Sequence, residues 1–458
     1  MPRPSSVHLI LNLKHMVDSA NPSNYEPVSL PLRHVAAVVA GNALEFYDFM
    51  TYSFFALQIG RTFFPSHNPL SSLLASLATF GAGFLTRPLG AYVIGRIADR
   101  TGRRPAMLLT FWLMGIAVAG IALTPSYSTI GAVAPILIVS WRLLQGFALG
   151  GEVGPTASFF IEAAPQDRRG IYGSLLAGTS GIAVFVAGLV GYGLSSFLAA
   201  DSLDRWGWRI AFLIGVAVVP LALAIRRSLP ETLHAVDAAS ITEPGQRGGY
   251  TTAALVGLVI LASGTMLTYA RAYMTTYAVG ILGMSSTAAF ICTIINGFCT
   301  LVFYLIGGWI SDRYGRRPVM ITFTLVLAAI ALPTFMAINN SRTPEVLYAS
   351  VALLTAVTGL GQGCVMTAIA ESLPQHVRAG ALGTIYAVAN AIFGGSAQLV
   401  VVWLIGASGN PLVPGWYLLG AALFGLAAMV KTRETAPVVI ATARQCQLHL
   451  CESGTTNA

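Results

Sequence analysis

The chain alternates between long apolar runs and short polar connections from about residue 34 to residue 431. Each run is long enough to cross a bilayer as a helix, which takes about 20 residues. The runs are continuous rather than alternating over ten residues, so they indicate helices and not the strands of a barrel. The twelve predicted helices lie at roughly 34–59, 70–95, 105–124, 131–161, 170–198, 208–227, 250–281, 287–311, 318–338, 345–372, 379–406 and 414–431.

The overall composition supports a protein that is embedded in a lipid bilayer. Apolar residues make up 55% of the 458 residues and charged residues only 10%, whereas soluble domains carry about 25% charged residues. The net charge of +8 does not indicate a nucleic-acid partner, because lysine occurs only as Lys14 and Lys431. The five cysteines show no metal-ligand spacing, and we expect neither a bound metal nor a cofactor.

The distribution of Lys and Arg predicts the orientation of the chain in the membrane. Nineteen of the 26 fall in alternate connections that begin with the N-terminal tail, four fall in the other connections and three lie within spans. Cytoplasmic loops carry the excess of positive charge in membrane proteins. We therefore expect a multi-pass membrane protein with an even number of spans and both termini in the cytoplasm.

Two sequence echoes predict an internal duplication. The stretch GRIADRTGRRP at 95–105 recurs as GWISDRYGRRP at 308–318, each residue 213 positions later. Glu162 and Glu371 end two apolar runs 209 positions apart, and each precedes a proline and an arginine. Two echoes at nearly one offset indicate that a six-helix unit occurs twice.

The polar connection in the middle of the chain divides these two units. We predict a cytoplasmic tail at 1–33, a six-helix bundle at 34–227, a cytoplasmic linker at 228–249, a second bundle at 250–431 and a cytoplasmic tail at 432–458. The fold class is all-α, with twelve transmembrane helices in two pseudo-symmetric bundles.

Several motifs resemble the major facilitator superfamily. The loop signature Gly-x-x-x-Asp-Arg-x-Gly-Arg-Arg occurs in both halves, and Arg142-x-x-Gln145-Gly opens a second family pattern. The stretches GNALEFYDF at 41–49 and RLLQGFALGGEVG at 142–154 are similar to metabolite–proton symporters. Within that group, TIGAVAPILIVSWRLLQGF at 129–147 is most similar to bacterial citrate and tricarballylate symporters, which implies a bacterial inner membrane protein. The resemblance implies a secondary transporter, not an enzyme, that takes up an organic acid with protons by alternating access.

Other functions stay open at this point. Arg271 stands where the family leads us to expect an uncharged residue. Symport of a dicarboxylate, shikimate or a zwitterionic osmolyte, a sugar porter and a drug-exporting antiporter are alternatives within the fold. A membrane sensor that transports nothing is an alternative of another class. ATP-driven transport is excluded because a P-loop needs Gly-Lys-Ser/Thr, and neither lysine follows a glycine.

Ionisable residues within the predicted spans are the candidate functional groups. An ionised side chain in the membrane costs about 2.5–3.5 kcal/mol on insertion scales, so such groups normally face a polar cavity. Glu45 and Asp48 are three positions apart on one helical face. Two adjacent carboxylates in low dielectric cannot both ionise cheaply, so one is expected to hold a proton. We predict proton coupling by Glu45, Asp48 and Glu152; an ion pair that only fixes helix packing is the alternative.

The intramembrane arginines are candidate ligands of a substrate carboxylate, because a guanidinium presents a planar fork of donors. By the family resemblance, Arg142 is also the partner of Glu45 and Asp48. We therefore expect Asp48, Arg142 and Arg271 to line one watery chamber between the halves. The predicted substrate-binding residues are Arg142, Gln145, Arg271, the stripe Tyr269, Tyr273 and Tyr277, and the amides Asn296 and Asn390.

The twin loops predict a gate on the cytoplasmic side. Asp99 and Asp312 are expected to accept backbone N–H bonds at a facing helix N-terminus, where the helix dipole favours anions. Arginines of the loops are expected to pair with nearby glutamates and to release them when the halves rock. The predicted gate comprises Asp99, Arg103, Arg104, Glu162, Arg169, Glu231, Asp312, Arg316, Arg317, Glu371 and Arg378. We expect a monomer.

Overall fold

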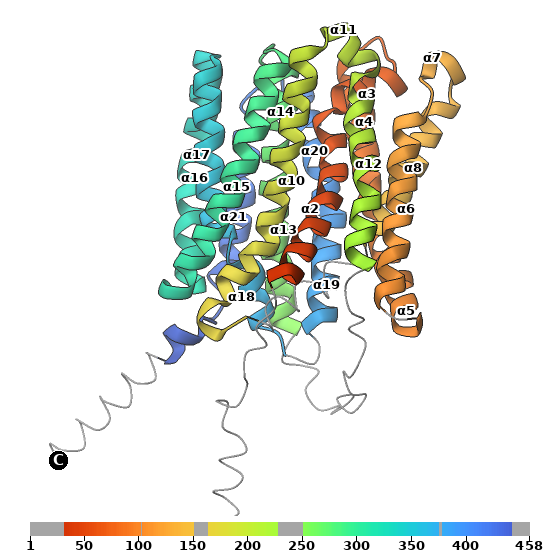
Figure 1. Cartoon of the computed structure of the whole chain (residues 1–458). Helices are drawn as coiled ribbons and strands as arrows, with labels where there is room; N and C mark the ends of the chain where they lie inside the picture. Colours follow the sequence, from red (N-terminus) through yellow and green to blue (C-terminus); the bar gives the residue numbers. More distant parts are fainter. Residues whose placement is uncertain (1–31, 102, 151–163, 228–250, 375–377, 442–458) are drawn as a thin grey trace, which may run out of the picture.

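A computed structural model describes residues 32–101, 103–150, 164–227, 251–374 and 378–441. These residues form helices joined by short turns, and no strand occurs among them. The helices stand side by side in one bundle, with α16 and α17 at one flank and α6 and α8 at the other (Figure 1). The predicted all-α fold class is confirmed.

In the first half, the described residues form six helical rods, several of which consist of two helices in line. Its main helices are α2 (Leu32–Phe54), α3 (Ala56–Phe63), α4 (Pro69–Leu85), α5 (Arg87–Thr101), α6 (Arg103–Leu123), α8 (Val133–Leu149), α10 (Arg169–Phe197) and α12 (Trp208–Arg227). Shorter turns join them at α7 (Tyr127–Ile130), η2 (Gln166–Arg168), α11 (Ala200–Ser202) and η3 (Leu203–Gly207).

The second half repeats this arrangement. Its helices are α13 (Thr251–Ala272), α14 (Met274–Gly280), α15 (Ser286–Tyr314), α16 (Arg316–Ser341), α17 (Pro344–Gln362), α18 (Val365–Glu371), α19 (Arg378–Ala389), the π-helical turn η7 (Asn390–Gly394), α20 (Gly395–Ser408) and α21 (Val413–Met429). Each predicted run coincides with one rod of the described chain, except that the fourth is described only as far as residue 150. The predicted linker and most of both tails lie outside the described residues.

Local sequence explains where several helices begin and break. The Asn68 side chain accepts a hydrogen bond from the Leu70 N–H, and Pro69 occupies the first turn of α4, where its missing N–H costs nothing. The rod made of α4 and α5 breaks at Thr86, two residues before Pro88, which cannot donate to the helix. The Thr86 hydroxyl instead donates to the Leu143 carbonyl at 2.7 Å, which joins this break to α8.

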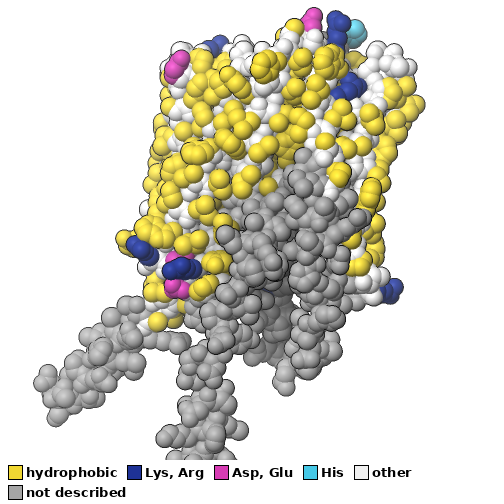
Figure 2. Space-filling view, viewed as in Figure 1, with side chains coloured by type: hydrophobic (Ala, Val, Ile, Leu, Met, Phe, Trp, Pro, Cys, Tyr) yellow, Lys and Arg dark blue, Asp and Glu magenta, His cyan; other side chains and the backbone are white. Residues whose placement is uncertain are grey.

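The outside of the bundle is apolar, as a lipid-facing surface requires. Hydrophobic side chains cover the flank in Figure 2, while charged side chains gather near the two ends. Among the described residues, seven helical segments are long and apolar enough to cross a membrane, and three shorter apolar helices accompany them. Large exposed side chains such as Phe298, Trp403 and Trp416 fit this surface.

The two halves meet along α4 with α20 and along α10 with α15. A Cβ atom added to Gly81 would lie 2.6 Å from the carbonyl oxygen of Gly395, and one added to Gly297 would lie 2.2 Å from the Phe185 nitrogen. Glycine is therefore required at both contacts, because the helix backbones approach too closely for a side chain. These two seams hold the halves side by side and leave a space between them near the middle of the bundle.

Candidate central cavity

A cavity of about 140 Å³ lies between the two halves. Helices α2 and α10 form one wall, and α13, α15, α17, α18, α19 and η7 form the other. The first wall offers mainly apolar side chains, among them Phe46, Met50 and Val184. The polar residues that line the cavity are Asn42, Ser180, Thr265, Thr268, Tyr269, Arg271, Asn296, Thr300, Tyr304, Gln362, Tyr386 and Asn390. Most of them belong to the second half.

The halves also touch on either side of this cavity. At one end, the ring of Phe55, the residue just before α3, contacts the ring of Phe290 on α15. The two ring centroids lie 5.0 Å apart. The other end, where α15 meets α16, carries Arg313, Arg316 and Arg317, and we call it the basic end. There, Asp312 contacts the start of α10. The cavity is therefore a central chamber with contacts between the halves above and below it.

Arg271 is the only charged side chain among the described residues that line the cavity. It is 4% exposed. Its Nε donates to the Leu267 carbonyl at 3.3 Å and its Nη1 to Asn296 Oδ1 at 3.5 Å, and both contacts are long. It forms no ion pair with a described residue, so its positive charge is available to an anion in the cavity. Arg271 thus lies at the cavity, and its role as a substrate ligand stays a prediction.

Three other predicted substrate ligands line the same cavity. Tyr269 packs its ring edge-on against Phe84 at 5.3 Å between centroids. Asn296 and Asn390 are 7% and 3% exposed and lie on opposite helices of the second half. Asn390 begins the π-helical turn η7, a distortion that often marks functional sites.

The rest of the predicted tyrosine stripe does not reach the cavity. Helix α13 ends at Ala272 and α14 begins at Met274, so the helix is interrupted at Tyr273. The Tyr277 hydroxyl donates to the Pro411 carbonyl at 2.9 Å and accepts from Asn339 at 2.9 Å. Neither Tyr273 nor Tyr277 lines the cavity. The expectation of one continuous stripe of donors facing the substrate is therefore wrong for this structure.

Asp48 lies on the side of α2 that faces α12. The α2 residues at the cavity are Asn42, Phe46 and Met50, which share one face, and Asp48 projects from the opposite face. A Cβ atom added to Gly215 on α12 would lie 1.8 Å from Asp48 Oδ1. Asp48 is 4% exposed, and this oxygen has no hydrogen-bond partner among the described residues.

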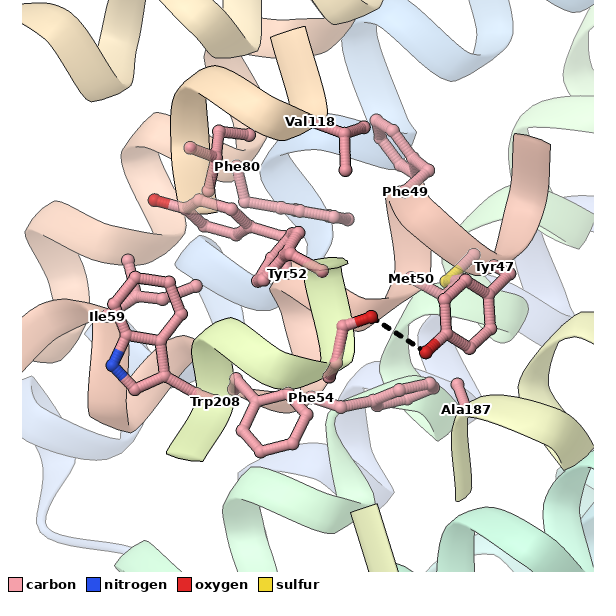
Figure 3. Close-up of a cluster of buried hydrophobic side chains, with 14 of the residues drawn as sticks. Tyr47, Phe49, Met50, Tyr52, Phe54, Ile59, Phe80, Val118, Ala187 and Trp208 are labelled. Atoms are coloured by element: carbon pink, nitrogen blue, oxygen red, sulfur yellow. Dashed lines mark hydrogen bonds between the residues drawn. The ribbon is translucent and has the colours of Figure 1, made fainter. Parts of the chain in front are cut away.

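Arg142 is buried in the first half and does not line the cavity either. Its guanidinium carbon lies 4.5 Å from the ring centroid of Phe49, 4.4 Å from that of Tyr52 and 5.0 Å from that of Phe80. Figure 3 shows these three rings within the cluster of buried side chains. Arg142 also donates to the Gln145 side chain and, at 3.3 Å, to the Phe80 carbonyl.

The expected chamber shared by Asp48, Arg142 and Arg271 is therefore corrected. Among the described residues, no ion pair joins Asp48 to Arg142. The aromatic rings and the Gln145 amide take up the Arg142 guanidinium, while Asp48 turns toward α12. Gln145 is fully buried beside Arg142 and is likewise absent from the cavity lining. Only Arg271 of the three ions faces the central chamber.

Asp312 joins the two halves at the basic end. Its carboxylate accepts the backbone N–H of Gly170 at 2.8 Å and that of Ile171 at 3.1 Å, at the N-terminus of α10. These are the contacts that the sequence analysis expected for this aspartate, and the helix dipole favours an anion there. Arg316 donates to the same carboxylate at 2.6 Å, which orients it.

Arg316 and Glu434 tie the end of α15 to the segment after α21. The guanidinium of Arg316 contacts Glu371 at 3.4 Å, as expected, and the Thr435 hydroxyl donates to Glu371 at 2.9 Å. The Glu434 carboxylate accepts the backbone N–H groups of Arg316 at 2.8 Å and Arg317 at 3.1 Å. Glu434 therefore caps α16. Residues 432–436 are packed at this corner rather than belonging to a free tail.

The remaining predicted gate residues are placed as follows. Arg317 donates to the Val430 carbonyl at 2.9 Å, and Arg378 donates to the Ala370 carbonyl at 2.7 Å. Both side chains therefore bind within the second half. The Arg169 carbonyl accepts from Thr367 at 3.3 Å, which is a further link between the halves. The side chains of Glu45, Asp99, Arg103 and Arg104 and the whole of Glu152, Glu162 and Glu231 lie outside the described residues.

Sequence reasoning missed three groups that the structure brings to these sites. Gln362 lines the cavity. Like Asn296, it is an isolated amide side chain within an apolar run, so the same pattern could have identified it. Thr355 donates to Asn296, and no sequence pattern marks it out. Glu434 follows the second half as Glu231 follows the first, since Glu-Thr recurs in RRSLPET and KTRETAP. Within the described residues, no three His, Cys, Asp or Glu side chains gather in a metal-binding group.

The arrangement of helices and loops defines a secondary transporter, and the comparisons identify its family. The sequence model of the Major Facilitator Superfamily matches residues 38–400 and 254–445. The chain belongs to this superfamily, and it is therefore a membrane transporter and not an enzyme.

Relatives of known function share most of the chain. It is 36% identical to the citrate-proton symporter of Salmonella typhi over 404 residues, which are 86% of this chain and 92% of the relative. It is also 36% identical to the alpha-ketoglutarate permease of Escherichia coli K12 over 385 residues, which are 81% of this chain and 88% of the relative. A crystal structure of a D-xylose-proton symporter shares the fold, with a TM-score of 0.71 and 20% identity over 89% of this chain and 98% of that one.

Proposed function

We propose that this chain carries citrate or a related tricarboxylate inward together with protons. The observation that carries the proposal is Arg271, a buried cation without an anionic partner among the described residues, set among neutral donors in a cavity between the halves. A guanidinium in such a place binds a carboxylate through charge-assisted hydrogen bonds. The similarity to a citrate-proton symporter supports the same substrate class.

A dicarboxylate is the second candidate. The alpha-ketoglutarate permease is as similar in percentage identity as the citrate symporter. Arg271 offers one fixed charge, which suits one carboxylate of either acid. The neutral wall around it recognises hydroxyl and carbonyl groups without regard to total charge. Shikimate and zwitterionic osmolytes also carry one carboxylate, whereas a sugar has none for Arg271 to bind.

The proposed orientation places the basic end in the cytoplasm, with both termini on that side of a bacterial inner membrane. Positive charge is concentrated in the connections at this end. Asp312 on the N-terminus of α10 then closes the cytoplasmic side while the cavity is open to the outside. Rocking of the halves breaks the contacts with Gly170 and Ile171 and opens the path inward.

Asp48 is the proton carrier that we propose among the described residues, with Glu45 and Glu152 as further members of this group. A buried carboxyl without a counter-charge is far less costly when it is protonated. Asp48 therefore takes up a proton from the outside and releases it on the cytoplasmic side. Asp48 lies beside α12 and not at the cavity. Its protonation therefore affects the substrate through movement of α2, which supplies Asn42, Phe46 and Met50 to the cavity wall.

Uptake by proteoliposomes tests this function. The purified full chain is reconstituted, and entry of labelled citrate, alpha-ketoglutarate, glycine betaine and xylose is measured with and without an imposed pH gradient. We expect citrate to accumulate only when the outside is acidic. Uptake of xylose but of no acid, or uptake of acids that ignores the pH gradient, would overturn the corresponding part of the proposal.

A further inference from the structure

The side-chain amide of Asn296 has only one orientation that fits its neighbours. Asn296 Oδ1 accepts from Arg271 Nη1 at 3.5 Å and from the Thr355 hydroxyl at 3.0 Å. An arginine has donors only, so the Asn296 atom that faces Arg271 must be the oxygen. Amide orientation is assigned from such partners. The Asn296 Nδ2 is then directed away from both, and it donates to no described residue.

This free amide nitrogen belongs to a residue that lines the cavity beside Arg271. Buried donors are normally paired, because an unpaired one loses its bonds to water without replacement. Gln362 Nε2 is a buried donor without a partner among the described residues, and Gln362 also belongs to the cavity lining. The second half therefore presents a guanidinium and amide donors to the same space.

Thr355 differs from Thr265 and Thr358 in the partner of its hydroxyl. Thr265 donates to the Leu261 carbonyl at 2.7 Å and Thr358 to the Leu354 carbonyl at 2.6 Å, each four residues earlier in its own helix. This is the common bond of a helical threonine. Thr355 on α17 is fully buried and gives its hydroxyl to Asn296 on α15 instead.

We propose that Thr355 is a positioning residue for a carboxylate subsite formed by Arg271 and Asn296. The Thr355 hydroxyl and Arg271 together hold Asn296 Oδ1, so that Asn296 Nδ2 points into the cavity beside the guanidinium. One carboxylate of the substrate then accepts from both residues, one oxygen from Arg271 and the other from Asn296. The inference rests on the proposed function. It identifies Arg271 and Asn296 as the donors that bind the substrate carboxylate and the Thr355 hydroxyl as the group that prevents the Asn296 amide from flipping.

Substitution of the threonine tests the subsite. Thr355→Val keeps the shape and removes the hydroxyl, so Asn296 is free to rotate. We expect the KM for citrate to rise roughly 3- to 10-fold, which corresponds to the loss of one hydrogen bond, with the maximal rate nearly unchanged. Thr355→Ser restores the hydroxyl and should return the KM to within about twofold of the original. Thr358→Val is the matched control, because its hydroxyl bonds only to its own helix.

The double variant separates positioning from a general effect on packing. If Thr355 acts through Asn296, Thr355→Val has no further effect on the KM once Asn296→Ala has removed the amide, and the two effects are not additive. An equal rise in both backgrounds, or an equal rise in Thr358→Val, would overturn the inference. Citrate-induced thermal stabilisation of the purified chain gives a second readout that does not depend on reconstitution.

Measurements on the wild-type protein separate a failure of the proposed function from a failure of the carboxylate subsite. If it transports or binds alpha-ketoglutarate rather than citrate, the variants are measured with that acid, and the subsite is still judged by them. If an acid moves without regard to the pH gradient, proton coupling fails while the subsite stands. If the wild type neither binds nor moves any acid of the panel, the proposed function and the carboxylate subsite both fail.

Discussion

Arg142 and Arg271 are both buried arginines within the bundle, yet their surroundings differ completely. Arg142 is fully buried in the first half beneath the rings of Phe49, Tyr52 and Phe80. Arg271 lines the cavity and makes no contact with the face of a described ring. Its hydrogen bonds are 3.3 and 3.5 Å long. Arg142 lies against ring faces with its Nε unpaired among the described residues, whereas Arg271 lines a cavity and makes only long hydrogen bonds to them.

The difference shows that burial alone does not assign a function to an intramembrane charge. Ring faces stabilise a cation by roughly 2 kcal/mol or more where water is excluded, so Arg142 needs no external anion. Arg271 lacks this compensation, and an anionic substrate supplies it. The same division holds for the two walls, because the first half contributes mainly apolar side chains and the second half most of the polar ones.

The largest effect is expected from Arg271→Gln. This variant removes the only charge that described residues bring to the cavity, and removal of one partner of a buried charged pair costs at least 2 kcal/mol. The kcat/KM for citrate uptake should fall roughly 30-fold or more. Arg271→Lys should recover part of the loss, since lysine keeps the charge but not the fork. Uptake close to wild type in Arg271→Gln would remove Arg271 from the site.

Asp48→Asn should separate proton coupling from substrate movement. The amide cannot release a proton, so the accumulation of citrate under a pH gradient should collapse to about equal concentrations inside and outside. Exchange of labelled for unlabelled citrate should persist, because the cavity residues are unchanged. The measurement compares both modes in the same vesicles. Undiminished accumulation would show that a group other than Asp48 carries the proton.

Local patterns predicted what the loops and helix ends do. The repeated loop placed Asp312 at a helix N-terminus and Arg316 beside Glu371, because these residues are close in sequence to rigid helix ends. The limits of the described helices also followed from the apolar runs, apart from the end of the fourth run, which lies outside the described residues. The loop pattern supplies the carboxylate and the guanidinium, while the packing of helices 142 and 55 residues apart in sequence supplies their partners.

Packing between distant helices was beyond the same reasoning. A spacing of three residues puts Glu45 and Asp48 on one face of α2, but it does not say which helix that face contacts. Asp48 lies against Gly215 on α12 and not against Arg142. Tyr269 and Tyr277 are eight residues apart, about 12 Å along a helix. The side chains of both tyrosines therefore cannot line one small cavity. Thr355 carried no sequence signal because its role depends on which α15 residue lies opposite.

Arg142→Gln should have the opposite profile to the Arg271 variant. Loss of the contacts to the three rings and to the Phe80 carbonyl should lower the free energy of unfolding by about 2–3 kcal/mol. The KM for citrate should stay within about threefold of wild type, since Arg142 does not line the cavity. Melting of the purified variant and its uptake kinetics report the two quantities. A strongly raised KM in a stable protein would return Arg142 to the substrate site.

Tyr277→Phe and Tyr269→Phe extend the comparison to two hydroxyls of the same rod. The Tyr277 hydroxyl bonds to Pro411 and Asn339, away from the cavity, so its removal should cost about 1–2 kcal/mol of stability and leave the KM unchanged. Tyr269 lines the cavity, and loss of its hydroxyl should raise the KM by about two- to fivefold if it contacts the substrate. Thermal melts and uptake assays of the pair measure both effects. Equal effects on the KM would mean that the whole stripe faces the substrate in another state of the transporter, because only a rearrangement at Tyr273 could bring Tyr277 to the cavity.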